Sequence, residues 1–214
     1  MDPLHLPDVS EFQADVEWEE VVKFNGGAAI VRALYGASHV DVMWAKGRRA
    51  AAHKAGAKVL GIYQYLVQGE DALAQAEAFV RTVGTLERGE FAVLDLEEGA
   101  GDQSERAKTW FEHVDAHLSY PGYAGAWLYS GKAFMDAHLS EFVAHSSRHL
   151  WIADYGVQPG DRHSLWQHTD GTIAVPDDWH EHWPGIGRCD CSIFSGSLEQ
   201  LHALTCGQAA ASGI

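Results

Sequence analysis

The chain has 214 residues, of which 46% are apolar, and its 15 Lys and Arg against 30 Asp and Glu give a formal net charge of -15. This apolar content is enough for one sizeable core, and barrels of this length commonly form one domain. The acidic balance excludes a surface that holds nucleic acid or anionic lipid through counterion release. We expect no nucleic-acid partner, and we expect a monomer.

The predicted elements alternate along the chain between short β-rich runs and longer amphipathic stretches, which is typical of βα units around a parallel sheet. Strands are predicted near residues 6–10, 28–34, 59–66, 91–97, 124–130, 149–155, 164–168 and 189–194. Helices near 15–24, 40–55, 69–86, 102–119 and 131–144 each follow a different strand, and another lies near 197–204. Eight strands with about five helices between them predict an α/β fold, an irregular TIM-like barrel that is incompletely wrapped by helices.

The last third of the chain has few helical signals. Residues 156–188 are rich in Gly, Pro, Asp and Trp and are predicted to be loop-like. The ending, residues 208–214, is predicted to be a flexible tail, which leaves residues 1–207 for the barrel.

Membrane and export signals are missing from the sequence. No run of eighteen apolar residues occurs, so we expect no insertion into a membrane. The first residues, MDPLHLPDVSEFQ, have neither the basic region nor the apolar segment of a secretory signal peptide. We therefore expect the chain to be made and first held in a cytoplasm.

The three cysteines, Cys189, Cys191 and Cys206, are odd in number and clustered late, which does not suit a disulfide framework. The C-x-C pair is a candidate for half of a metal site, but no second such pair completes it. Apolar packing is the favoured interpretation. If Asp190 points into the barrel, strand alternation turns both neighbouring thiols outward.

The predicted strand ends carry acidic and aromatic side chains where a core would select apolar ones. In βα barrels functional groups gather at the carboxyl ends of the strands. The residues there are Asp8, Tyr63, Tyr65, Asp95, Glu97, Tyr129, Asp154, Tyr155, Gln167 and Asp190. A single Asp at a strand end is more often a cap or turn residue, but the convergence of several predicts a site.

The run FAVLDLEEG is the most informative segment. In a strand, residues two apart share a face, so Asp95 and Glu97 point one way and Glu98 points the other. Two carboxyls in a confined mouth cannot both ionise cheaply, so one stays protonated as a general acid. Glycoside hydrolysis needs this division of roles, although the strand leaves the carboxyl separation, and with it the stereochemistry, open. A Mg²⁺ or Ca²⁺ site is the alternative.

Aromatic residues support a sugar ligand, because pyranose rings lie against flat faces. The sequence has eight Trp and seven Tyr. Tyr63, Tyr129, Tyr155 and Trp166 are the predicted lining residues, whereas Trp127 and Trp151 are predicted to belong to the core.

The chain resembles glycoside hydrolase family 25, the Chalaropsis-type lysozymes found in fungi, actinobacteria and phage endolysins. The matching segments occur in the family's order and span residues 7–196; they are PDVSEFQ, AAIVRALYG, AHKAGAKVLGIYQY, QAEAFV, VLDLEEG, LYSGKAF, LWIADYG, LWQHT and CDCSIFSG. The combination of D-V-S-x-x-Q, D-x-E and a late Asp strand is fairly specific.

The resemblance implies a barrel of eight strands with few helices and hydrolysis of the β-1,4 bond between N-acetylmuramic acid and N-acetylglucosamine in peptidoglycan. By position, Glu97 corresponds to the acid/base, with Asp95, Asp8 and Asp190 as further acids of the site. Either Asp95 assists directly as nucleophile or the substrate's N-acetyl oxygen attacks, and we favour the latter. Substrate binding is assigned to Tyr63, Tyr65, Gln64, Tyr129, Tyr155, Trp166, Gln167 and Arg32.

Two segments depart from the family pattern. Gln64 stands where members often carry His, and the loop 170–188 has no match. We expect a muramidase without metal or cofactor, as a phage endolysin held in the host cytoplasm before lysis. The alternatives are a catalytically weak sugar- or wall-binding virion module, and a metal-dependent hydrolase of acetylated sugars. The His113–His117 pair is better explained as a solvated helix face than as a zinc site.

Overall fold

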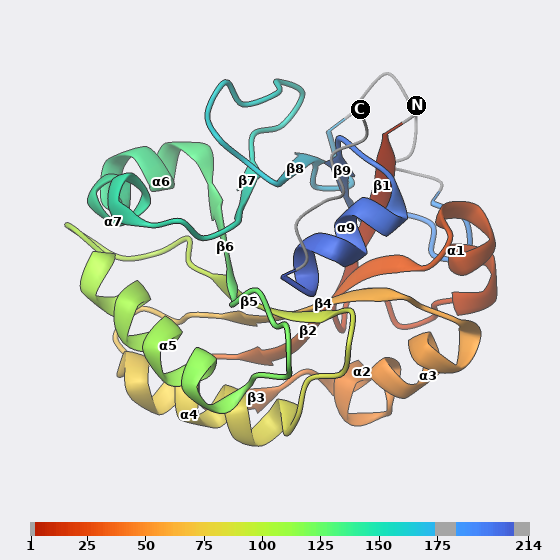
Figure 1. The fold of residues 1–214 in the computed structure, drawn as a ribbon, viewed down its shortest axis with the longest axis horizontal. Helices are drawn as coiled ribbons and strands as arrows, with labels where there is room; N and C mark the ends of the chain where they lie inside the picture. Colours follow the sequence, from red (N-terminus) through yellow and green to blue (C-terminus); the bar gives the residue numbers. More distant parts are fainter. Residues whose placement is uncertain (1–2, 174–182, 208–214) are drawn as a thin grey trace.

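The computed structural model describes residues 3–173 and 183–207. The helices and strands follow in the order β1 (Leu4–Val9), α1 (Trp18–Asn25), β2 (Ala28–Tyr35), β3 (His39–Val40), α2 (Val42–Ala45), α3 (Arg48–Ala55), β4 (Val59–Tyr65), α4 (Ala72–Val83), β5 (Glu90–Asp95), α5 (Ser104–His117), β6 (Trp127–Gly131), α6 (Lys132–His138), α7 (Ser140–His145), β7 (Leu150–Ala153), β8 (Leu165–Thr169), β9 (Asp190–Phe194) and α9 (Leu198–Thr205) (Figure 1). Part of the loop 170–188 and the whole predicted tail lie outside the described residues.

Eight strands close into a barrel in the order β1-β9-β8-β7-β6-β5-β4-β2, and pairing of β1 with β2 completes the ring. The ninth strand, β3, adds only a short hairpin edge to β2. The barrel expectation is confirmed. The expectation of a parallel sheet holds for seven strands and is wrong for β9, which runs antiparallel to β1 and β8.

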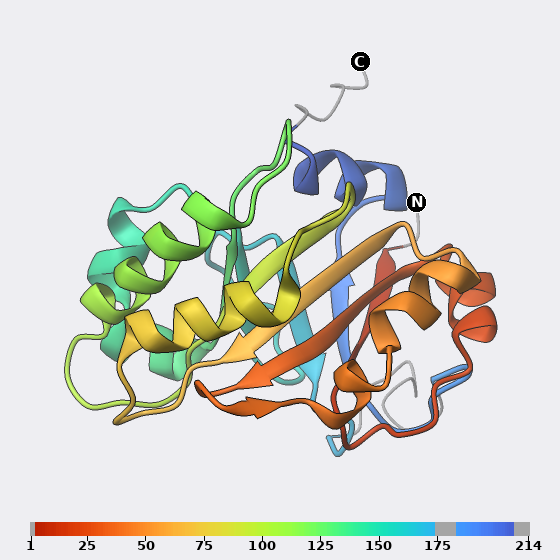
Figure 2. The same ribbon diagram turned by 90° about the horizontal axis from the view of Figure 1, so that it is seen from below.

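The structure has eight helices in its described part rather than about five. The predicted stretch 40–55 divides into α2 and α3 because Gly47 adopts a left-handed conformation at φ 93°. The stretch 131–144 likewise divides at Leu139. Helices α4 and α5 pack side by side outside the sheet (Figures 1 and 2). Within the described residues no helix lies between β7 and β8 or between β8 and β9.

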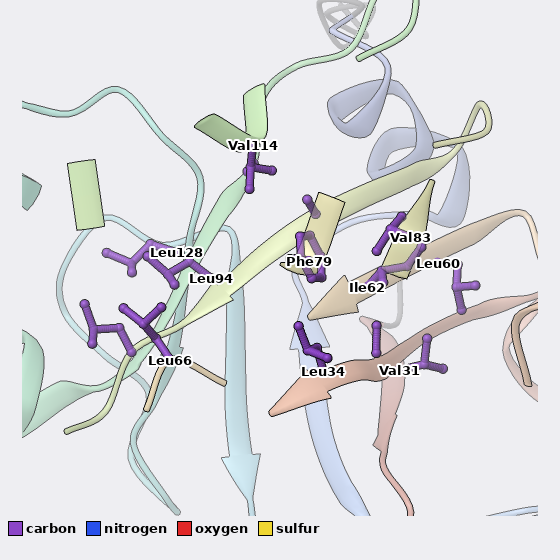
Figure 3. Close-up of a cluster of buried hydrophobic side chains, with 14 of the residues drawn as sticks. Val31, Leu34, Leu60, Ile62, Leu66, Phe79, Val83, Leu94, Val114 and Leu128 are labelled. Carbon is purple, nitrogen blue, oxygen red and sulfur yellow. The ribbon is translucent and has the colours of Figure 1, made fainter. Parts of the chain in front are cut away.

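Two apolar layers hold this arrangement, because alternate residues of each strand face inward and outward. The inner layer fills the barrel and includes Trp127 and Trp151, both almost fully buried, which confirms their predicted place in the core. The outer layer lies between strands and helices; Figure 3 shows its residues Val31, Leu34, Leu60, Ile62, Leu66, Phe79, Val83, Leu94, Val114 and Leu128.

Cys189 and Cys191 are buried and belong to the outer layer, as strand alternation predicts. No helix in the described part of the chain is both long enough and apolar enough to cross a bilayer.

Candidate active site

A pocket of about 220 Å³ opens at the carboxyl ends of the parallel strands. Its lining residues are Asp8, Ser10, Phe12, Gln13, Arg32, Tyr63, Tyr65, Asp95, Glu97, Tyr129 and Asp190. Asp190 is the first residue of β9, and it reaches this mouth because β9 runs in the opposite direction to its neighbours, opposite Asp8 of β1. The structure therefore brings all four predicted acids into one pocket.

Asp95 and Glu97 lie in hydrogen-bonding contact through their carboxyl groups. Asp95 ends β5, and Leu96 continues the pairing by donating its N–H to the Tyr129 carbonyl at 3.1 Å, so the alternation extends to Glu97. Glu98 is turned away from the pocket, and its side chain accepts a hydrogen bond from the backbone N–H of Gln68. The prediction that Asp95 and Glu97 share a face, with Glu98 on the other, is confirmed.

Gln167 ties the other two acids together. Its Nε2 donates to Asp8 Oδ2 and to Asp190 Oδ2, each at 3.3 Å. Its Oε1 accepts from the hydroxyl of Tyr129 at 2.7 Å and from that of Tyr155 at 3.3 Å. One buried amide thus fixes two carboxyls and two tyrosines, although Gln167 and Tyr155 stand behind or beside the pocket rather than in its lining.

Arg32 supplies the positive charge of the pocket. Its Nε donates to Asp41 Oδ2 at 3.1 Å and its Nη2 donates to Glu11 Oε1 at 2.8 Å. Asp41 is fully buried and also caps α2 by accepting from the Met43 amide at 2.8 Å. The guanidinium is therefore held from behind, where it favours the ionised forms of Asp8 and Asp95.

Burial sets the protonation of the site. It is the largest cause that raises the pKa of Asp8, Asp95 and Glu97, followed by the charge of Asp190 at Asp8 and that of Glu97 at Asp95. Burial, with the charges of Asp170 and Glu97, also raises the pKa of Asp190 to about 7. Asp95 and Glu97 titrate as one unit because they share a hydrogen bond. The site therefore keeps a proton near neutral pH, as general acid catalysis requires.

Aromatic faces continue outward from the acids. The ring of Tyr65 stacks on Tyr35 with centroids 4.8 Å apart and planes 6° from parallel. Phe12, in the turn after β1, is 81% exposed, and the Arg32 guanidinium lies 5.5 Å from its ring centroid. These exposed rings offer flat surfaces beside the pocket.

Two predicted substrate-binding residues face away from the pocket, and their assignment is corrected. Gln64 is fully buried beneath α4 and α5: its Nε2 donates to the carbonyls of Gly36 and Gln75, and its Oε1 accepts from Trp110 Nε1 at 2.6 Å. The reason is strand alternation, because its neighbours Tyr63 and Tyr65 face the pocket.

Trp166 is the second correction. Its neighbours on β8, Leu165 and Gln167, face the barrel interior, so its own ring lies outside the barrel wall. There its Nε1 donates to the Asp154 carbonyl at 2.7 Å.

Four residues of the site were not predicted individually: Ser10, Phe12, Gln13 and the Arg32 anchor Asp41. The first three follow Asp8 within the D-V-S-x-x-Q segment, and Ser10 N–H donates to Gln13 Oε1 at 3.0 Å. Their position directly after an acidic strand end was the available signal. Among the described residues no histidine lines the pocket, so its donor set does not match a histidine-based metal hydrolase.

Known proteins resemble this chain over most of its length. The family model for glycosyl hydrolases family 25 matches residues 7–176. The uncharacterized protein YegX of Escherichia coli (strain K12) is 26% identical over 220 residues, which cover 95% of this chain and 74% of YegX.

Solved structures share the fold. A bacterial lysozyme from Streptomyces coelicolor is 22% identical with a TM-score of 0.78, covering 98% of this chain and 100% of its own. A muramidase from Trichobolus zukalii is 19% identical with a TM-score of 0.77, covering 96% and 100%. The catalytic domain of an endolysin from a Listeria monocytogenes bacteriophage is 20% identical with a TM-score of 0.73, covering 97% and 98%. Since the family match spans most of the chain, the chain belongs to glycosyl hydrolase family 25 and is a glycoside hydrolase.

Proposed function

We propose that this enzyme is an N-acetylmuramidase, which cleaves the β-1,4 bond between N-acetylmuramic acid and N-acetylglucosamine in peptidoglycan. The observation that carries the proposal is the convergence of Asp95, Glu97, Asp8 and Asp190 in one pocket of a family 25 barrel. Its similarity in fold to a lysozyme and a muramidase supports the substrate class.

In the proposed reaction Glu97 acts as the acid and then the base. Its proton passes to the glycosidic oxygen as the bond from that oxygen to C1 breaks, and its carboxylate later takes a proton from the water that attacks C1. Glu97 suits this role because it lies at the open end of the pair, whereas Asp95 is almost fully buried.

We propose that the substrate's own N-acetyl oxygen closes onto C1 in the first step. The Asp95 carboxyl is almost fully buried and interacts with the Glu97 carboxyl, so it is enclosed by its surroundings. Asp95 is then better placed to accept the acetamido N–H and steady the oxazolinium ion than to attack C1 itself.

Release of new reducing ends from purified peptidoglycan tests the proposal, with a matched pair of variants. Glu97→Gln removes the proton donor and should lower the rate by at least about 100-fold, the usual contribution of general acid catalysis. Glu98→Gln changes the same functional group one residue along, on the opposite face, and should keep near wild-type activity. Equal rates in the wild type and Glu97→Gln would reject the proposal.

The second candidate function is a wall-binding module on the same barrel. Gln64 departs from the family pattern, but it lies away from the pocket, so this departure does not favour binding without catalysis. Sedimentation with insoluble wall distinguishes the two functions, because retention without soluble fragments would favour the module.

We further propose that the enzyme is a phage endolysin that waits in the host cytoplasm. The shared fold with a phage endolysin catalytic domain supports this origin. Expression in a bacterial cytoplasm should leave cells intact until the inner membrane is permeabilised. Lysis before permeabilisation would contradict a cytoplasmic, membrane-gated enzyme.

A further inference from the structure

The outer face of the barrel wall behind the catalytic acids carries a cluster of two histidines and a cysteine. His5, His168 and Cys191 offer one ligand atom each, and these atoms lie within 4.8 Å of one another. Cys191 is fully buried, His168 is 3% exposed and His5 is partly buried.

Three adjacent strands supply one residue each to this cluster. Strand β9 lies between β1 and β8 and contributes Cys191, which pairs with Pro7 of β1, two residues from His5. On the other side, the pairing of β8 with β9 shifts register between Gln167 and Thr169, next to His168. Because Gln167 faces the barrel interior, strand alternation places His168 on the same outer face as Cys191.

One distance between donor atoms is close to that expected in a tetrahedral zinc centre. The Cys191 Sγ lies 3.8 Å from His5 Nδ1. A zinc ion with Zn–S of about 2.3 Å and Zn–N of about 2.0–2.1 Å places S and N about 3.6 Å apart. The two imidazole rings meet edge to face, with centroids 6.0 Å apart and planes at 77°. All three donor atoms lie within 4.8 Å of one another, close enough for one ion to draw them together.

We propose that His5, His168 and Cys191 supply three ligands of a zinc site. Two imidazoles and one thiolate are donors that zinc accepts. On binding, the Cys191 thiol releases its proton to solvent as the Zn–S bond forms. The proposal adds a ligand role to Cys191, whose place in the outer apolar layer agrees with the packing predicted from the sequence.

A bound ion would link the first strand, β1, to the last two strands, β8 and β9. Its ligands join β1 to β8 and β9, the strands that carry Asp8, Gln167 and Asp190 on their inner faces. The ion would lie on the outer side of the wall, so the acids would still perform the hydrolysis. Removing zinc should therefore lower thermal stability while activity at 25 °C persists.

Cobalt spectroscopy on the untagged, EDTA-treated protein tests the site, because a thiolate ligand gives Co²⁺ a charge-transfer band in the near ultraviolet. We expect this band and tetrahedral visible bands at one equivalent of Co²⁺, both removed by Zn²⁺. Cys191→Ser should abolish the charge-transfer band. His168→Gln and the less buried His5→Gln should each weaken Zn²⁺ binding at least about tenfold. At about 100 times the dissociation constant, Zn²⁺ should raise the Tm of the wild type by about 5–10 °C.

Matched controls separate this cluster from others in the chain. Cys189→Ser removes a buried thiol on the same strand region, and Cys206→Ser removes a thiol whose sulfur lies 3.9 Å from the His202 ring nitrogens. Double substitution of His113 and His117 by Gln removes the stacked pair on α5. All three should keep the band. The absence of a thiolate band in the wild type would overturn the proposal, and so would loss of the band in Cys206→Ser. Full Zn²⁺ binding by Cys191→Ser would also overturn it. If Cys191→Ser does not fold, full binding by His5→Gln has the same meaning.

Discussion

Replacing Asp190 by Asn should stabilise the protein at alkaline pH and leave its stability little changed in acid. Burial raises the pKa of Asp190 from 3.8 to about 7 in the folded state. The folded protein therefore binds more protons than the unfolded chain between these two values, so the free energy of unfolding falls as pH rises through this window. Asn imitates the protonated acid and can still accept from Gln167.

The size of the effect follows from the two pKa values. Compared with a residue that stays neutral, Asp190 lowers the free energy of unfolding by about 4 kcal/mol at pH 8 and by less than about 1 kcal/mol at pH 4. Asp190→Asn should therefore raise the Tm by roughly 8–16 °C at pH 8. Its activity should fall, because the acid belongs to the pocket.

Urea unfolding of the wild type and Asp190→Asn at pH 4, 6 and 8 measures this difference directly. Asp15→Asn makes the same change at an exposed position and should alter stability by no more than about 0.5 kcal/mol at any of these pH values. A stabilisation by Asp190→Asn that is absent at pH 8, or equal at pH 4 and pH 8, would contradict a raised pKa of Asp190 in the folded state.

Three further predictions concern other parts of the molecule. Gln167→Leu removes the amide between Asp8 and Asp190 and should lower kcat/KM on solubilised glycan at least about tenfold; unchanged kinetics, as expected for the exposed Gln158→Leu, would contradict its positioning role. Trp127→Ala leaves a cavity in the barrel interior beside Phe91 and should lower the free energy of unfolding in urea by about 3–5 kcal/mol. A decrease below about 1 kcal/mol would show that the barrel interior is loosely packed. The net charge of -15 should repel walls that bear teichoic acid, so lysis should first rise as salt screens charges beyond about 10 Å at 0.1 M, and a rate that only falls with salt would argue against repulsion.

Much of the fold was predictable because strand periodicity and turn residues are local signals. Eight strand positions and the shared face of Asp95 and Glu97 follow from them. The direction of β9 was not predictable, since it depends on how the connection from β8 returns to the barrel. Because β9 runs in the opposite direction, Asp190 at the start of this strand lies at the mouth formed by the carboxyl ends of the parallel strands.

The sequence already contained the reason why Gln64 and Trp166 do not line the pocket. The alternation that places Asp95 and Glu97 together also places Gln64 opposite Tyr63 and Tyr65, and Trp166 opposite Gln167. Neither the chemical type of a residue nor its position in the family pattern shows which face of a strand it occupies. The amide network of Gln167 was beyond reach, because it joins β8 with β1, β6 and β9 through side chains far apart in sequence.

Mass spectrometry of the fragments released from peptidoglycan, after borohydride reduction, identifies the sugar at each new reducing end. Every new end should carry reduced N-acetylmuramic acid, and Glu97→Gln should abolish these fragments while Glu98→Gln should not. Fragments that end in reduced N-acetylglucosamine would contradict it.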